Sequence, residues 1–177
     1  TMSTALRRML FALLEYAKIG YQQAFSYIGA LLLMNVDTEE DAFWLMVALV
    51  CPGGVLPDGY FTDHKVDADL RVVRELTEAH IDRRLARHMS AYGLDVSLFA
   101  NGWMQALLTA HVPPPTACRV LDVIFAEWSN AVVVRFVVAF LALNHDHIMT
   151  VDDLGSLGQF ANAWARNLWS ADSVMQL

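Results

Sequence analysis

The chain has 177 residues, and its 12 lysines and arginines against 19 aspartates and glutamates give a net charge of −7. This balance argues against a protein that binds nucleic acid or anionic lipid through charge, because such binding depends on clustered cations. Apolar residues make up 56% of the chain and charged residues 18%, so intrinsic disorder is excluded. At this length we expect one domain over residues 1–177 with a substantial core.

No segment of the chain predicts a membrane span or a secretory signal. Residues 19–36 form the longest uncharged stretch, but they include polar side chains that are costly in lipid, and residues 131–143 are too few and include Arg135. The opening residues lack the apolar region of a signal peptide. The two cysteines, Cys51 and Cys118, have no metal-type spacing and cannot build a disulfide framework. We therefore expect a reduced, cytoplasmic domain without a transmembrane segment.

The first part of the chain predicts three helices. Apolar residues at a three-to-four spacing between Leu6 and Leu14 indicate an amphipathic opening helix. After a break near Gly20, a second apolar run continues through Met34. Residues 37–40 form an N-cap with a capping-box carboxylate three residues on, which predicts a third helix that stops at residues 51–54. Residues 56–64 are expected to be a loop or a short helical turn.

The rest of the chain also predicts helices. Residues 66–89 carry the clearest apolar stripe with charged residues on the other faces, and a further helix over residues 97–111 is halted by three successive prolines. The last of these prolines is suited to open the next helix. The further helices are expected over residues 116–128, over residues 129–144, just after the capping residues 150–153, and over residues 160–169. Strand alternation is not convincing anywhere, so the predicted fold class is all-α, with about eight to ten helices and no sheet.

Most groups with possible chemistry have a simpler structural explanation. His145 and His147 would point to different faces of a helix, so a solvated helix end is favoured over a metal site. Cys51 precedes a proline at a helix end and Cys118 lies in an apolar stripe, which favours packing over nucleophilic roles. Asp122 interrupts an apolar run, and we expect it to have a structural role such as an ion pair with a neighbouring helix. No metal or organic cofactor is expected.

One polar cluster is not explained in this way. Residues 20–23, Gly-Tyr-Gln-Gln, directly precede a strongly apolar helix, where Ser, Thr, Asp or Asn would be more usual. Gln cannot act as a general base. Its amide accepts and donates hydrogen bonds at the same time, however, which suits it to orient a water molecule.

At this cluster the chain resembles the TBC domain of Rab GTPase-activating proteins. The resemblance extends in order and spacing over nearly the whole chain, and it is carried by residues 6–10, residues 19–23 with the YxQ motif, Ala42-Phe43-Trp44, Tyr60-Phe61, Trp103 and residues 119–122. It implies an all-helical domain that accelerates GTP hydrolysis by a small Rab-type GTPase.

The resemblance also implies which side chains act. In that family an arginine of an IxxDxxR motif neutralises phosphate charge, and the glutamine of YxQ orients the attacking water. The glutamine corresponds to Gln23 and its aromatic partner to Tyr21, while Gln22 takes the variable position between them. The Tyr21 ring, two residues before Gln23, would brace the Gln23 side-chain amide. The partner would bring GTP and Mg²⁺, so no cofactor is implied for this chain.

The chain departs from the family pattern at several places. The IxxDxxR motif lies upstream of YxQ in the family and is absent here; Arg7 and Arg8 lie between the two motif positions and do not replace it. We therefore expect residues 1–177 to resemble the larger C-terminal part of a TBC domain. Ala24 follows YxQ where glycine is usual, Trp128 stands where glycine is frequent, and Leu121 replaces an aromatic residue.

Three interpretations follow. The leading one is a Rab GTPase activator that supplies Gln23 in trans, and the second is a catalytically inactive TBC-like module that binds a GTPase or another protein. The third is a helical scaffold with no GTPase partner. As an activator, the chain is expected to reach trafficking membranes through its partner. Given its hydrophobicity, we also expect the isolated chain to self-associate, because the upstream part of such a domain would cover apolar surface.

Overall fold

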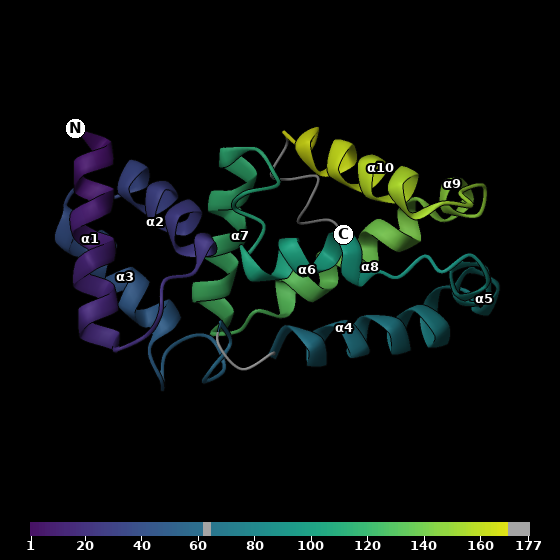
Figure 1. Cartoon of the computed structure of the whole chain (residues 1–177), viewed down its shortest axis with the longest axis horizontal. Coiled ribbons are helices and arrows are strands. Elements are labelled where there is room, and N and C mark those ends of the chain that lie inside the picture. The colour runs from purple at the N-terminus through teal and green to yellow at the C-terminus, as the bar shows by residue number, and fades with distance from the viewer. Residues whose placement is uncertain (62–64, 170–177) are drawn as a thin grey trace.

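A computed structural model describes residues 1–61 and 65–169, and within these residues the chain forms helices and no strand (Figure 1). The predicted all-α class is therefore confirmed. The helices are α1 (Met2–Ala17), α2 (Gln23–Asn35), α3 (Glu39–Val50), α4 (Lys65–Leu76), the π-helical turn η1 (Thr77–Ile81), α5 (Arg83–Ala91), α6 (Ser97–Gln105), α7 (Pro114–Glu127), α8 (Ala131–Leu143), α9 (His145–Ile148) and α10 (Leu154–Arg166).

The first three helices pack against one another at one end of the molecule (Figure 1). Gly29 of α2 lies so close to α1 that a methyl group there would meet the end of the Met9 side chain. Thr38 caps α3, since its hydroxyl oxygen accepts a hydrogen bond from the Asp41 N–H at 3.0 Å. An ion pair between Arg8 and Glu39 connects α1 with α3. The N-cap predicted before the third helix is confirmed.

The remaining helices surround an aromatic core. Helix α7 lies between the two parts of the molecule and contacts both α2 and α8 (Figure 1). The fully buried ring of Trp103 on α6 meets Phe99 at a centroid distance of 5.0 Å and both Phe136 and Phe140 at 5.4 Å. Edge-to-face rings at these distances gain energy beyond their buried area. This cluster holds α6 and α8 together.

The prediction of one helix over residues 66–89 is wrong. Helix α4 ends at Leu76, η1 follows, and extended backbone at Asp82 (φ −160°, ψ 127°) separates η1 from α5. The buried Thr77 hydroxyl donates to the Val73 carbonyl at 2.7 Å, and the Asp82 carboxylate accepts from the Arg84 N–H at 2.7 Å. Asp82 therefore starts a new helix, because a side-chain cap favours a helix start over continuation.

The helix predicted over residues 97–111 is shorter than expected. Helix α6 ends at Gln105, and Leu107 and Leu108 take left-handed backbone conformations with φ of 47° and 65°. Such conformations cost roughly 1–2 kcal/mol per non-glycine residue. Both leucine side chains are completely buried, and this burial offsets the cost. An apolar pattern alone does not reveal the reversal of the chain.

The C-terminal helices differ from the prediction in number and bounds. The two helices expected after residues 150–153 and over residues 160–169 are a single helix, α10, whose start is capped by the Asp153 carboxylate accepting from the Ser156 N–H at 2.9 Å. Helix α7 begins at Pro114, before the predicted position, and ends ahead of Trp128, which has a left-handed backbone with φ of 53°. In the predicted loop over residues 56–64, residues 62–64 lie outside the described residues.

None of the helices in the described ranges combines the length and the hydropathy that crossing a bilayer requires.

Candidate functional site

The two residues predicted from the YxQ motif lie at the start of α2. Gln22 is the N-cap residue with extended backbone (φ −118°, ψ 138°), and Gln23 is the first helical residue. The Tyr21 side chain is 53% exposed, and Gln23 is exposed as well. Both side chains are therefore accessible to a partner protein.

Each of the two side chains has a hydrogen-bond partner on α2. The Tyr21 and Ser26 hydroxyl groups lie 2.8 Å apart, and the Gln23 amide N–H donates to the Tyr27 hydroxyl oxygen at 3.4 Å. Within the described part of the chain the Gln23 amide oxygen has no hydrogen-bond partner. The group that contacts the Gln23 amide is thus Tyr27, four residues further along the helix, whereas Tyr21 bonds to Ser26.

An open groove of about 410 Å³ adjoins Tyr21 between α1 and α2. The Arg7 guanidinium carbon lies 5.6 Å from the centroid of the Phe11 ring, which is a cation–π distance. The other lining residues are Ser3, Leu6, Leu10, Leu14, Tyr21 and Ser26. Sequence reasoning missed Ser26, Tyr27 and this groove; the spacing of four residues between Gln23 and Tyr27 on one helix is the signal that points to their contact.

The histidine cluster behaves as a structural helix end. One ring nitrogen of His145 lies 2.9 Å from the Asp146 carboxylate, and the other lies 3.3 Å from the Asp82 carboxylate. The His147 ring lies against the Phe160 ring, with a distance of 4.0 Å between the ring centroids. Among the described residues no group of three or more histidines, cysteines or carboxylates is arranged to hold a metal ion.

The remaining sequence candidates occupy structural positions. Cys51 and Cys118 are half-buried. Burial raises the pKa of the Cys51 thiol, and burial together with nearby Asp122 raises the pKa of Cys118, which disfavours the reactive thiolate. Asp122 is exposed and lies 3.8 Å from Arg119 of its own helix. Among residues 1–61 and 65–169, the ion pair of Asp122 is therefore within α7 and not with a neighbouring helix.

The sequence matches the family model described as the Rab-GTPase-TBC domain over residues 1–149. The chain belongs to the RabGAP-TBC family. This match covers most of the chain and includes Tyr21, Gln23 and the groove beside them. A Rab GTPase-activating role is therefore supported at the level of the family.

Similar proteins agree with this assignment. The chain is 26% identical over 175 residues to mouse TBC1 domain family member 2A, covering 97% of this chain and 18% of the relative. It is 31% identical over 173 residues to bovine Small G protein signaling modulator 3, covering 96% of this chain and 22% of the relative. The chain thus spans about a fifth of the length of these relatives.

A solved structure confirms the TBC fold. The crystal structure of the Chlamydomonas flagellar RabGAP TBC domain superimposes with a TM-score of 0.87 at 29% identity, over 98% of this chain and 57% of that chain.

Two of the departures from the TBC pattern have a clear structural setting. Trp128, where the family often has glycine, has the left-handed backbone that glycine adopts most easily. Leu121, in place of an aromatic residue, is 4% exposed and packs in the core.

Proposed function

We propose that this chain activates GTP hydrolysis by a Rab-type GTPase, with Gln23 entering the nucleotide site of the partner. The match to the Rab-GTPase-TBC family over residues 1–149 carries the proposal of the activity. The exposure of Gln23 at the first position of α2 supports the choice of residue. We also propose that residues 1–177 act as one domain, similar to the larger C-terminal part of a TBC domain, and reach trafficking membranes through the partner.

The chemistry proposed for Gln23 is the orientation of the attacking water. Phosphoryl transfer depends mainly on positioning and charge stabilisation, with little covalent chemistry for the protein to perform. The amide N–H of Gln23 is engaged by Tyr27, so the amide oxygen is left to accept a hydrogen bond from the water. Tyr21, held through Ser26, lies beside the α1–α2 groove. We assign it a contact with the partner next to Gln23.

A second candidate is a TBC-like module that binds a GTPase without stimulating hydrolysis. It is favoured by Ala24, because glycine is usual after YxQ in the family and the added methyl group would crowd a close approach to the partner. Residues 1–177 themselves contain no Ile-x-x-Asp-x-x-Arg motif. An arginine that stabilises the transition state is worth roughly 10³–10⁵ in rate. Acceleration by this chain would therefore require an arginine from another source.

The test is single-turnover GTP hydrolysis by a panel of purified Rab proteins with this chain in stoichiometric excess. We expect one Rab to be accelerated and Gln23→Ala to reduce that acceleration by about 100-fold, because loss of one positioned polar group at a reacting centre typically costs 10²–10³. Binding of the same Rab, measured in parallel by calorimetry, is expected to change little.

The matched control is Gln159→Ala. Gln159 is also an exposed helical glutamine, but it lies on α10, so this variant is expected to keep full acceleration. Equal acceleration by Gln23→Ala and the unaltered chain would contradict the role of Gln23. Saturable binding of a Rab with no acceleration would favour the binding module instead.

A further inference from the structure

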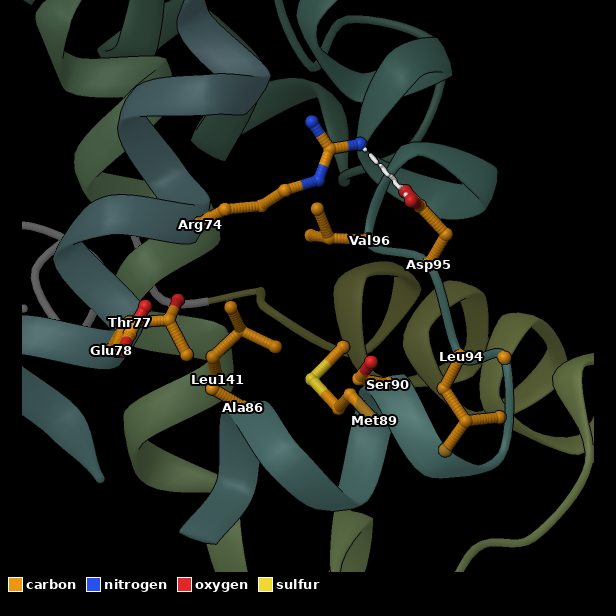
Figure 2. A pocket seen from close by; sticks show the side chains of 11 residues that line it. Arg74, Thr77, Glu78, Ala86, Met89, Ser90, Leu94, Asp95, Val96 and Leu141 are labelled. Carbon is orange, nitrogen blue, oxygen red and sulfur yellow. Dashed lines mark hydrogen bonds and ion pairs between the residues drawn. The ribbon is translucent and has the colours of Figure 1, made fainter. Parts of the chain in front are cut away.

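A second cavity lies in the part of the molecule away from α1–α3. It has a volume of about 440 Å³, is partly open to solvent, and is lined by residues of α4, η1, α5, the segment 93–96 and α8 (Figure 2). Pockets of 300–1,000 Å³ are the usual size of sites for small groups. Its lining includes neither Tyr21 nor Gln23, so it is separate from the site proposed for GTPase activation.

The inner wall of this cavity is aliphatic. Its most buried apolar members are Met89, Leu94, Val96 and Leu141, which are 7%, 2%, 3% and 1% exposed. Figure 2 shows Leu141 and Met89 facing the cavity from α8 and α5. A methionine thioether adapts its shape to an incoming chain. The wall therefore suits an unbranched aliphatic group.

Three charged side chains line the cavity, and two of them neutralise each other. The Arg74 guanidinium donates to both carboxylate oxygens of Asp95, at 2.9 and 3.1 Å (Figure 2). Asp95 also accepts from the Ser97 N–H at 2.7 Å, which fixes the pair in place. The third side chain, Glu78, has no ion pair or hydrogen bond among the described residues. The cavity thus presents one uncompensated negative charge.

The backbone that carries Glu78 is unusual. Glu78 lies in η1, where the helix widens into a π-helical turn. Turns of this type are rare and often occur at functional sites. The preceding residue, Thr77, is 4% exposed and bonded to the Val73 carbonyl, so the start of the turn is held firmly. The backbone that carries Glu78 is therefore held in place, and the exposed Glu78 side chain lines the cavity from it.

We propose that this cavity binds a lysine side chain of a partner protein. The aliphatic stem of the lysine lies against Met89, Val96 and Leu141, and its ammonium group pairs with Glu78. A protein is favoured as the source because exposed apolar residues flank the lining segment 93–96 in the chain: Tyr92 is 53% exposed and Leu98 is 57% exposed. A protein partner can contact these side chains as well as the cavity, whereas a single small amine cannot. The net charge of −7 also favours a basic partner segment.

The test uses NMR of the chain with ¹³C-labelled methionine methyl groups, titrated with capped peptides. The probes are Ac-Leu-Lys-Leu-NH₂, the same peptide with norleucine or glutamate in place of lysine, and free n-pentylamine. The Met89 signal is assigned with Met89→Leu. We expect this signal to shift saturably with the lysine peptide. The norleucine peptide should bind about tenfold more weakly and the glutamate peptide more weakly still, because a charge-assisted hydrogen bond is lost.

Two variants separate the charge from general effects. Glu78→Gln is expected to abolish the difference between the lysine and norleucine peptides, whereas Glu75→Gln, an exposed residue of α4 that does not line the cavity, should preserve it. An unshifted Met89 signal, or a glutamate peptide that binds as tightly as the lysine peptide, would overturn the proposal. Pentylamine binding as tightly as the peptide, with no loss in Tyr92→Ala, would overturn the assignment to a protein partner.

Discussion

A small polar network connects four parts of the chain at the level of single residues. The Asn130 side chain, 8% exposed at the N-cap of α8, donates to the Asp69 carboxylate of α4 at 2.6 Å. The nearby Tyr60 hydroxyl donates to the Met104 carbonyl of α6 at 3.0 Å. Burial raises the pKa of Tyr60, and the Asp69 charge adds to this. Buried polar groups of this kind are stable only when they are paired.

The same network makes stability depend on pH. Burial raises the pKa of Asp69 above the ordinary value of 3.8, and the hydrogen bond from Asn130 opposes this only in part. The folded chain therefore holds a proton on Asp69 more tightly than the unfolded chain does. The stabilising contribution of Asp69 to the free energy of unfolding is fully present below pH 3.8. This contribution is lost as pH rises through the pKa that Asp69 has in the folded chain.

We predict that Asp69→Asn removes this dependence while keeping an oxygen that accepts from Asn130. Urea unfolding at a series of pH values, from below 3.8 to neutrality, measures the free energy for both chains. The difference in the free energy of unfolding, unaltered chain minus variant, should fall as pH rises. Other carboxylates titrate in both chains and cancel in the difference. A difference that is constant or rises with pH would contradict the raised pKa.

The sequence motif names candidate site residues but does not reveal their hydrogen-bond partners. Tyr21 and Gln23 follow from the YxQ motif, and the structure places both on the surface at the start of α2; their roles stay predictions. Ser26 and Tyr27 were not foreseen as their partners, because a side-chain hydrogen bond depends on rotamers that a motif does not specify. Asp122 was expected to have a structural role such as an ion pair with a neighbouring helix, but its exposed carboxylate lies 3.8 Å from Arg119 of the same helix.

At the level of elements, a tight turn after α3 directs the chain back into the core. The Gly54 N–H donates to the Cys51 carbonyl at 3.1 Å, and the Val55 N–H donates to the Ala48 carbonyl at 2.7 Å. Val55 and Leu56 are then each 3% exposed. A Cβ atom on Gly54 would lie against the Ala48 and Cys51 carbonyl oxygens, closer than real Cβ atoms approach backbone. Only glycine fits this turn without a backbone shift.

We predict that Gly54→Ala destabilises the chain by about 1–3 kcal/mol, the usual cost of forcing an extra methyl group into a packed site. The matched control is Gly20→Ala, because a Cβ atom on Gly20 meets nothing within 4 Å. That variant should change the unfolding free energy by less than about 0.5 kcal/mol. Urea unfolding of both variants measures the difference; equal stability of the two would show that the turn adapts to a side chain.

Element boundaries follow from the sequence where a cap or a proline marks them. The Thr38 cap of α3 and the prolines at residues 113–115 are visible in the sequence and mark helix starts in the structure, although α7 begins at Pro114 and not after the last proline as predicted. The break at Asp82 was missed because the apolar stripe continues across it, and the end of α6 was missed because Leu107 and Leu108 are apolar residues in left-handed conformations. At Asp82 a local side-chain cap overrides the apolar pattern, and at Leu107 and Leu108 tertiary burial does so.

At the level of the whole molecule, exposed aromatic side chains gather on the α1–α3 end. The exposed fractions are 63% for Phe11, 56% for Tyr16 and 49% for Trp44. The centroid of the Tyr16 ring lies 5.8 Å from the centroids of both the Phe43 and Trp44 rings, edge to face. Tyr16, Phe43 and Trp44 therefore form one surface cluster. Exposed apolar patches of this kind are typical of interaction surfaces and favour association in solution.

We therefore predict that the isolated chain self-associates with rising concentration, more strongly at high ionic strength because salt screens the repulsion from its net charge of −7. Sedimentation velocity over a concentration series measures this. Trp44→Gln should shift the distribution toward monomer, because it removes a ring from the surface cluster. Leu143→Gln, which removes a side chain 61% exposed on α8, should not. A monodisperse monomer at every concentration, or equal effects of both variants, would show that the α1–α3 surface does not drive association.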